Sequence, residues 1–307
     1  MNESVLSFKD KYFGDKNFYK MTLTIAIPII IQNLLTNLVS MADNIMVGQL
    51  GTNQMSGVAI INQLFFVFNL LVFGGMSGAG LFSAQYFGQK NHNGVRDVFR
   101  MKILIGITII AISISVMIFL HEPLINMFLH EGSSSGNIQE TFNYAKNYLY
   151  IMVIGIAPFV ISNCYNTTLK ESGQTVVPMK AGVLAVVFDI VLNYIFIFGK
   201  LGFPAMGVVG AAIATVISRF VECGYLVIYT HIHSNDYPFI KHCYRTLKVP
   251  GSLVKKIIIT GAPLMLNEFL WAGGLTLQTQ ALSTKGLATV GGLNICNTIG
   301  NISNCIL

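Results

Sequence analysis

Eight apolar stretches constrain the fold of this chain more than any other feature of its sequence. They cover residues 21–47, 55–82, 101–120, 143–166, 176–199, 206–230, 252–282 and 287–307. Each is long enough for a helix to cross a bilayer, which takes roughly 17–25 residues. Hydrophobic residues make up 53% of the chain and charged residues only 10%, whereas a soluble domain carries roughly 25% charged residues. Because backbone groups in lipid must bond within their own segment, and no barrel-like alternation is present, we predict an all-α polytopic membrane protein.

Basic residues fall unevenly between these stretches and predict the orientation of the chain. One set of loops holds Lys9, Lys11, Lys16, Lys20, Lys90, Arg96, Arg100, Lys102, Lys170, Lys180, Lys241, Arg245, Lys248, Lys255 and Lys256. The alternate loops hold Lys146, Lys200 and Lys285, and Arg219 lies inside a stretch. The positive-inside rule therefore predicts a cytoplasmic N-terminus. Residues 1–20 lack an apolar core followed by a cleavage site, so we expect the first stretch itself to insert the protein.

Two aspartates lie inside apolar stretches, where a carboxylate is costly. Asp43 is near the end of the first stretch and Asp189 is inside the fifth. A charge in a spanning helix costs about 2.5–3.5 kcal/mol on insertion scales, and such residues usually face a protein interior and move protons or ions. This favours a transporter over a passive anchor. Asparagines and threonines inside the apolar stretches have two possible roles, between which the sequence does not decide. They can be ligands of an ion, or they can form hydrogen bonds that hold neighbouring helices together.

An internal repeat appears when the chain is shifted by 235 residues against itself. Lys20 then meets Lys255, Pro28 meets Pro263, Leu35 meets Leu270, Gly51 meets Gly286, Gly57 meets Gly292, Ile60 meets Ile295, Asn62 meets Asn297 and Asn69 meets Asn304. Such repeats are common in secondary transporters, with ligand sites within or between the copies. An even number of spans separates the copies, so they are parallel. We predict an N-terminal segment 1–20, a six-helix bundle 21–232, a linker 233–251 and the start of a second bundle at 252–307.

Several ordered motifs resemble the multidrug and toxic compound extrusion (MATE) family. They are Pro28 followed by Met41-Ala-Asp-Asn-Ile-Met-Val-Gly48, then Leu169-Lys-Glu-Ser-Gly173 before Pro178, then Asp189-Ile-Val-Leu-Asn193, and Gly207-Val-Val-Gly-Ala-Ala-Ile-Ala-Thr215. The resemblance implies an exporter of two six-helix bundles in the cytoplasmic membrane of a bacterium-like cell. It also implies coupling to Na⁺ or H⁺, cationic amphipathic substrates, and no cofactor. Family members are longer than this chain, so a fragment or a non-functional truncated remnant is an alternative.

The same resemblance assigns the candidate cation site of the first bundle. The positions are Asp43, Asn163, Asn166, Asp189, Asn193 and Thr215, with Asn267 and Glu268 as a candidate substrate or cation site in the second bundle. In archaeal members the fifth-span pair reads Asn then Asp, whereas here it reads Asp189 then Asn193. A spacing of four keeps both side chains on one helical face.

Other functions find less support in the sequence. No Walker pattern predicts ATP binding, no basic face with interleaved aromatics predicts nucleic-acid binding, and no nucleophile–base set predicts an enzyme. Cys164, Cys223, Cys243, Cys296 and Cys305 show no CxxC spacing, so we expect apolar fillers and no metal site beyond Na⁺. We also expect a structural ion pair between Arg219 and Glu222, three residues apart. A flippase for lipid-linked oligosaccharides is the alternative transporter, although such proteins tend to have a strongly basic cavity.

Overall fold

The computed structural model describes residues 15–129 and 137–285, together with 289, 291–293, 295–297 and 300. Within these residues the regular structure is helical and contains no strand. The predicted all-α fold class is therefore confirmed. The predictions on Lys9 and Lys11, and most of the stretch 287–307, lie outside the described residues.

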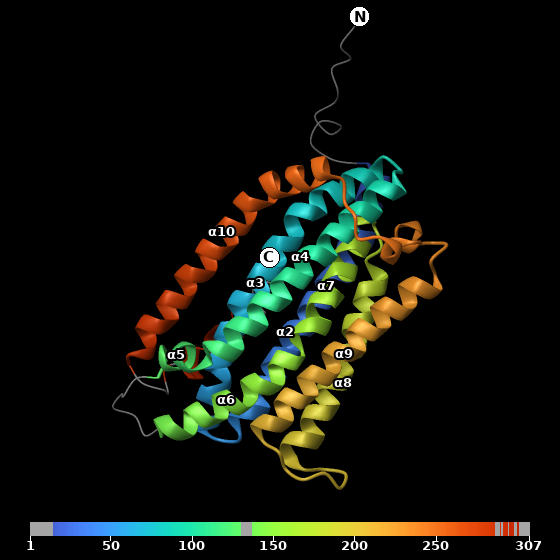
Figure 1. Cartoon of the computed structure of the whole chain (residues 1–307). Coiled ribbons are helices and arrows are strands. Elements are labelled where there is room, and N and C mark those ends of the chain that lie inside the picture. The colour runs from blue at the N-terminus through green and yellow to red at the C-terminus, as the bar shows by residue number, and fades with distance from the viewer. Residues whose placement is uncertain are drawn as a thin grey trace, which may run out of the picture.

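Long helices lie side by side in an elongated bundle (Figure 1). They are α2 (Lys16–Gly48), α3 (Thr52–Gly88), α4 (His92–Phe119), α5 (His121–Asn126), α6 (Ile138–Ile154), α7 (Ile156–Glu171), α8 (Val176–Phe198), α9 (Val208–Ile232) and α10 (Gly251–Ser283), with the 3₁₀ turns η1 (Pro238–Ile240) and η2 (Cys243–Arg245). By length and composition α2, α3, α4, α8 and α9 can each cross a membrane, and α6 with α7 can form one bent span. These six spans correspond to the first six apolar stretches.

The fourth span is broken, which the sequence prediction of one continuous helix over 143–166 did not include. Helices α6 and α7 meet at Gly155 and are bent by 48°. Pro158 has no N–H to donate to the carbonyl of Ile154. The hydrogen bond that would join α6 and α7 into one continuous helix is therefore missing at this point. The break follows from this missing donor and from the adjacent glycine.

Helix α4 begins earlier than the hydropathy indicated. Asn91 caps it by accepting a hydrogen bond of 3.0 Å from the Gly94 N–H, an arrangement typical of asparagine at this position. Arg96, Arg100 and Lys102, which were predicted to lie in the loop between the second and third spans, are therefore residues of α4. Lys102 lies in the third turn of α4, and its side chain is fully buried.

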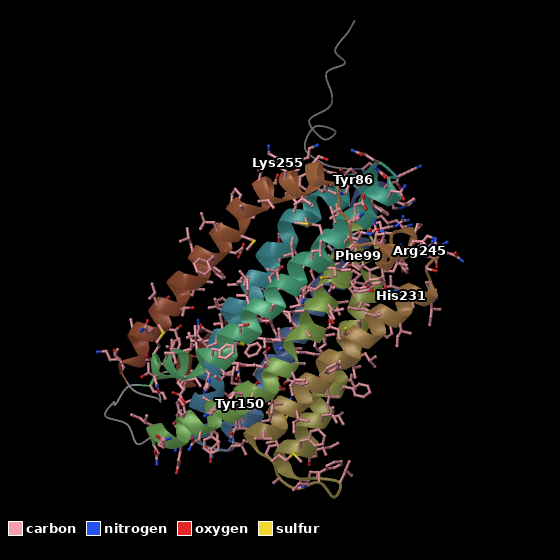
Figure 2. The ribbon with its side chains drawn as sticks, viewed as in Figure 1. Tyr86, Phe99, Tyr150, His231, Arg245 and Lys255 are labelled. Carbon is pink, nitrogen blue, oxygen red and sulfur yellow. The ribbon has the colours of Figure 1, made fainter. Side chains whose placement is uncertain are left out.

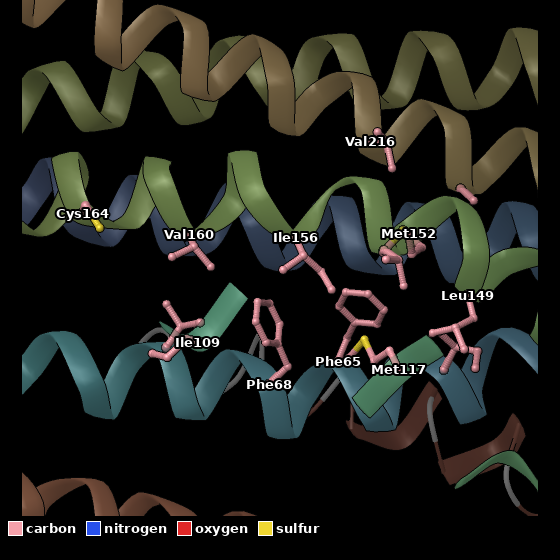
Figure 3. Packing of buried hydrophobic residues seen from close by; sticks show 14 of the residues in the cluster. Phe65, Phe68, Ile109, Met117, Leu149, Met152, Ile156, Val160, Cys164 and Val216 are labelled. Carbon is pink, nitrogen blue, oxygen red and sulfur yellow. The ribbon is translucent and has the colours of Figure 1, made fainter. Parts of the chain in front are cut away.

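The core of the bundle surrounds α3, whose inner face contacts α4, α6 and α7. Phe65 and Phe68 of α3 point toward α6 and α7, where Met152, Ile156 and Val160 line the opposite side (Figure 3). Outside this apolar cluster lie the hydrogen-bonded polar side chains that α2, α8 and α9 share, which are Asp43, Asp189, Asn193 and Ser218.

Helix α10 runs along α3 (Figure 1). Trp271 packs on Phe66 with ring centroids 5.9 Å apart, and Gln63 donates a hydrogen bond of 3.2 Å to Thr276. Helix α10 has 33 residues and is long enough to cross a membrane. By its composition, however, it is not among the candidate membrane spans. Its spanning role stays a prediction.

We expect Gly78→Ala to loosen the contact between α3 and α10. A methyl group at Gly78 would overlap the Cα atom of Gly261, and neither helix can yield without moving its backbone. The measurement is quenching of Trp271, the only tryptophan of the chain, by brominated lipid. Gly273→Ala is the control, because a Cβ there meets nothing within 4 Å. Equal quenching in both variants would contradict the close packing of these helices.

Candidate ion-binding site

The structure brings the two intramembrane aspartates together around one asparagine. The Asn193 amide nitrogen donates hydrogen bonds of 2.6 Å to Asp43 Oδ1 and 3.0 Å to Asp189 Oδ2. Asp43 comes from α2, while Asp189 and Asn193 lie one turn apart on α8. The spacing of four predicted that Asp189 and Asn193 share a face, and their hydrogen bond shows that they do.

Helix α9 closes the other side of this cluster with hydroxyl groups. Ser218 donates a hydrogen bond of 2.8 Å to Asp189 Oδ1, and its oxygen also lies 2.8 Å from the carbonyl of Ala214. Thr215, three residues earlier on the same helix, interacts with the Asp189 carboxyl as well. Thr215 was among the predicted site residues, whereas Ser218 was missed. A spacing of three from Thr215 was the signal that could have found it.

The cluster is largely shielded from solvent and is rich in oxygen atoms. Asp189 is 5% exposed and Asn193 is fully buried, while Asp43 is half-buried. Among the described residues, the side-chain oxygen of Asn193 has no hydrogen-bond partner. Two carboxylates that share one amide repel each other when both are charged, so a proton or a cation between them is favourable. Hard cations prefer such oxygen ligands. The arrangement can therefore exchange a small cation or a proton.

The two asparagines of α7 are not joined to this cluster. Asn163 donates its amide to the carbonyl of Phe159 in its own helix, at 2.9 Å. The side-chain oxygen of Asn166 is buried and has no hydrogen-bond partner in the part of the chain that the structure describes. Within the described residues no hydrogen bond links either one to Asp43 or Asp189. Helix α7 packs chiefly on α9, α4 and α3, and touches α8 little. Their role as cation ligands stays a prediction.

The candidate residues of the second repeat lie elsewhere. Asn267 is exposed on α10, and Glu268 is half-buried against Gly74 of α3. Glu268 lies at the contact between α10 and α3, and no hydrogen bond joins either residue to the aspartate pair in the described part of the chain.

Arg219 does not form the ion pair with Glu222 that the sequence predicted. In the described part of the chain its guanidinium has no carboxylate within 4.0 Å. Its Cζ atom lies 5.3 Å and 5.0 Å from the ring centroids of Phe65 and Phe159, and Nη1 lies 3.4 Å from the carbonyl oxygen of Gly155. The aromatic faces attract the cation, so its direct contacts are the two rings and the carbonyl, and Glu222 acts on it only at longer range.

A second charged cluster was not anticipated from the sequence. Lys102 Nζ lies 2.6 Å and 2.8 Å from the two carboxylate oxygens of Glu171, and donates to Thr167 at 3.0 Å and Thr168 at 3.2 Å. This network ties α4 to the end of α7. Glu171 fits against α3 because Gly80 has no side chain there.

Histidines and cysteines form no comparable site. Where the structure describes them, no group of three metal-binding side chains occurs, and Cys164, Cys223, Cys243 and Cys296 are free thiols. His231 stacks on Tyr244 and contacts the end of the bundle that also carries Phe99 and Arg245 (Figure 2). Burial there raises the pKa of the Cys243 thiol to about 11, so this cysteine is an unreactive filler.

The spanning helices, and the carboxylate pair that α2 and α8 bring together between them, are features of a polytopic membrane protein of the transporter class. The MatE family model matches residues 28–195, more than half of the chain. The chain therefore belongs to the MatE family, whose members are transporters and not enzymes. The resemblance inferred from the sequence motifs is confirmed.

Individual relatives agree with this assignment. A protein of Thermotoga maritima named "Probable multidrug resistance protein NorM" is 30% identical over 284 residues, which are 92% of this chain and 59% of the relative. The "Probable multidrug resistance protein YoeA" of Bacillus subtilis is 27% identical over 253 residues, covering 80% of this chain and 51% of that protein. The chain thus spans about half to three fifths of the length of these relatives.

Solved structures show the same fold. An outward-facing multidrug resistance MATE transporter of the MOP superfamily matches with a TM-score of 0.71 at 23% identity, over 93% of this chain and 64% of that one. The MATE multidrug transporter DinF-BH matches with a TM-score of 0.80 at 22% identity, over 93% and 61% of the two chains.

Proposed function

We propose that this chain forms the ion-coupled bundle of a secondary antiporter, which exports cationic amphipathic compounds in exchange for Na⁺ or H⁺. The observation that carries the proposal is the pair Asp43 and Asp189, bridged by Asn193 inside the bundle. Relatives named as multidrug resistance proteins support drug export. The asymmetric charge of the loops supports a cytoplasmic N-terminus in a bacterial cytoplasmic membrane.

In this mechanism Asp43 and Asp189 bind and release the coupling ion. With the ion bound, their charges are offset and α2 stays against α8, the helix it contacts most. When the ion leaves, repulsion between the carboxylates favours separation of α2 from α8. Pro28, buried within α2, leaves one carbonyl of the helix without its usual donor, so α2 can bend there at low cost.

The substrate would bind beside α10 rather than at the ion site. Glu268 supplies a carboxylate next to the α3 face, and Asn267 adds an amide. A carboxylate attracts a cationic substrate, and an aromatic residue nearby adds a cation–π surface. Trp271 and Phe66 provide such rings.

The test is efflux of a cationic dye in inverted membrane vesicles that contain the full-length protein, with the Na⁺ and pH gradients varied separately. We expect one of the two gradients to drive dye movement and ATP to have no direct effect. Dye movement that ignores both gradients would overturn the proposal. Binding of lipid-linked pyrophosphates in preference to cationic dyes would favour the flippase instead. Against that alternative, Lys102 is neutralised by Glu171 and Arg219 is covered by two rings.

A further inference from the structure

Arg219 occupies an unusual position for a charged residue inside a membrane span. A desolvated guanidinium is normally paired with a carboxylate, yet the partners of Arg219 are two aromatic faces and one backbone carbonyl, all of them neutral. Among the described residues no carboxylate pairs with it within 4.0 Å, and Glu222 and Asp189 act on its positive charge only through space.

The carbonyl that Arg219 contacts belongs to the break in the fourth span. Gly155 is the residue that caps the end of α6. Its carbonyl oxygen also accepts a hydrogen bond of 3.3 Å from the N–H of Phe159 in the first turn of α7. A Cβ atom at Gly155 would lie 3.2 Å from Arg219 Cδ and 3.3 Å from Nη1. The glycine thus lets the arginine reach the backbone at the bend. Figure 3 shows Phe65, one of the two rings beside Arg219, pointing toward Met152 and Ile156.

The residue before Arg219 is attached to the ion site. Ser218 donates its 2.8 Å hydrogen bond to Asp189, so one turn of α9 joins the carboxylate pair to the bend between α6 and α7. Tyr148 of α6 is buried within electrostatic range of Asp43, Asp189 and Arg219. Both sides of the break therefore meet the same charged cluster.

We propose that Arg219 is a positioning residue that couples occupancy of the Asp43–Asp189 site to the angle between α6 and α7. This inference rests on the proposed ion-coupled function. With a cation bound, the carboxylates are offset and Arg219 stays on the Gly155 carbonyl and the two rings. When the cation leaves, the uncompensated carboxylates attract the guanidinium, which releases the Gly155 carbonyl and frees the bend. The fourth span then changes its angle in step with the ion.

Hydrogen–deuterium exchange of the purified full-length protein tests this coupling. Peptides that cover residues 150–160 report on the bend, and peptides that cover 185–195 report on the ion site. Each is measured with Na⁺ against choline, and at low against high pH. In the wild type we expect ion removal to raise exchange in both regions, by about fivefold or more at the bend.

Arg219→Met should make exchange at the bend independent of the ion while the ion-site peptides still respond. Ser218→Ala, which keeps Arg219 in place but cuts its link to Asp189, should weaken the ion dependence, and Arg219→Lys should retain part of it. Gly224→Ala on the same helix is the control, because a Cβ there meets nothing within 4 Å. If Arg219 had a purely structural role, Arg219→Met would raise exchange at the bend by the same factor with and without the ion.

The outcomes separate the two proposals. If the ion-site peptides respond to the ion but the bend does not, or if Arg219→Met and Ser218→Ala keep the full response at the bend, the coupling role is wrong and the ion site stands. If neither region of the wild type responds to Na⁺ or pH, the ion site itself is wrong, and the coupling role falls with it.

Discussion

Asp189→Asn is expected to reduce ion-driven efflux strongly while leaving the protein folded. Asparagine has nearly the same shape as aspartate, so it can still accept the Ser218 hydrogen bond, but it carries no charge that a proton or cation could offset. Loss of a coupling free energy of about 1–3 kcal/mol would reduce the ion-dependent component of efflux roughly 5- to 150-fold. Dye efflux from inverted vesicles, with the gradient that drives the wild type, measures the effect.

A swapped variant provides the matched control for this substitution. Asp189→Asn combined with Asn193→Asp moves the carboxylate one turn along α8 and recreates the order found in archaeal members of the family. Because residues 189 and 193 both contact the same cluster, the swap should restore a large part of the coupling that Asp189→Asn removes. Wild-type coupling in Asp189→Asn itself would show that this carboxylate does not carry the ion.

The helices and the centre of the site could be predicted because they depend on local sequence patterns. Long apolar runs can satisfy their backbone in lipid only as helices, so α8 matches the stretch 176–199 within one residue. Asp189 and Asn193 face one way because helical spacing fixes it. Their meeting with Asp43, which is 150 positions from Asn193, came from family resemblance, since no local pattern connects α2 with α8.

The features that were missed depend on packing. Little in the local sequence distinguishes Ser218 from other serines, because only the packing of α9 against α8 places it beside Asp189. Hydropathy does not distinguish a lysine in a loop from a lysine that a neighbouring helix buries. Lys102 was therefore predicted to belong to a loop. Asn163 was predicted as a ligand from family likeness, and local sequence could not show that its amide is bonded within its own helix; its role as a ligand stays a prediction. Gly155 and Pro158 together did signal the break in the fourth span, and a helix prediction should weigh such a pair.

Lys102→Met is expected to produce the largest loss of stability. It leaves the Glu171 carboxylate, only 18% exposed, without its cation and next to the backbone of Gly80. Breaking a buried pair on one side typically costs about 3–5 kcal/mol. Since 1 kcal/mol lowers the melting temperature of a chain of this size by about 2–4 °C, the loss should be roughly 6–20 °C. A thiol-reactive fluorophore measures it in detergent, because Cys164 is buried beside this network and becomes reactive on unfolding.

Combining Lys102→Met with Glu171→Gln separates the cost of an orphaned charge from the cost of lost packing. The double variant removes both charges and keeps the shape of both side chains, and replacing a whole buried pair by neutral groups is often close to neutral. Most of the lost stability should therefore return. If the double variant melts as low as Lys102→Met alone, the network holds α4 to α7 through its threonine hydrogen bonds and packing, and the ion pair adds specificity rather than stability.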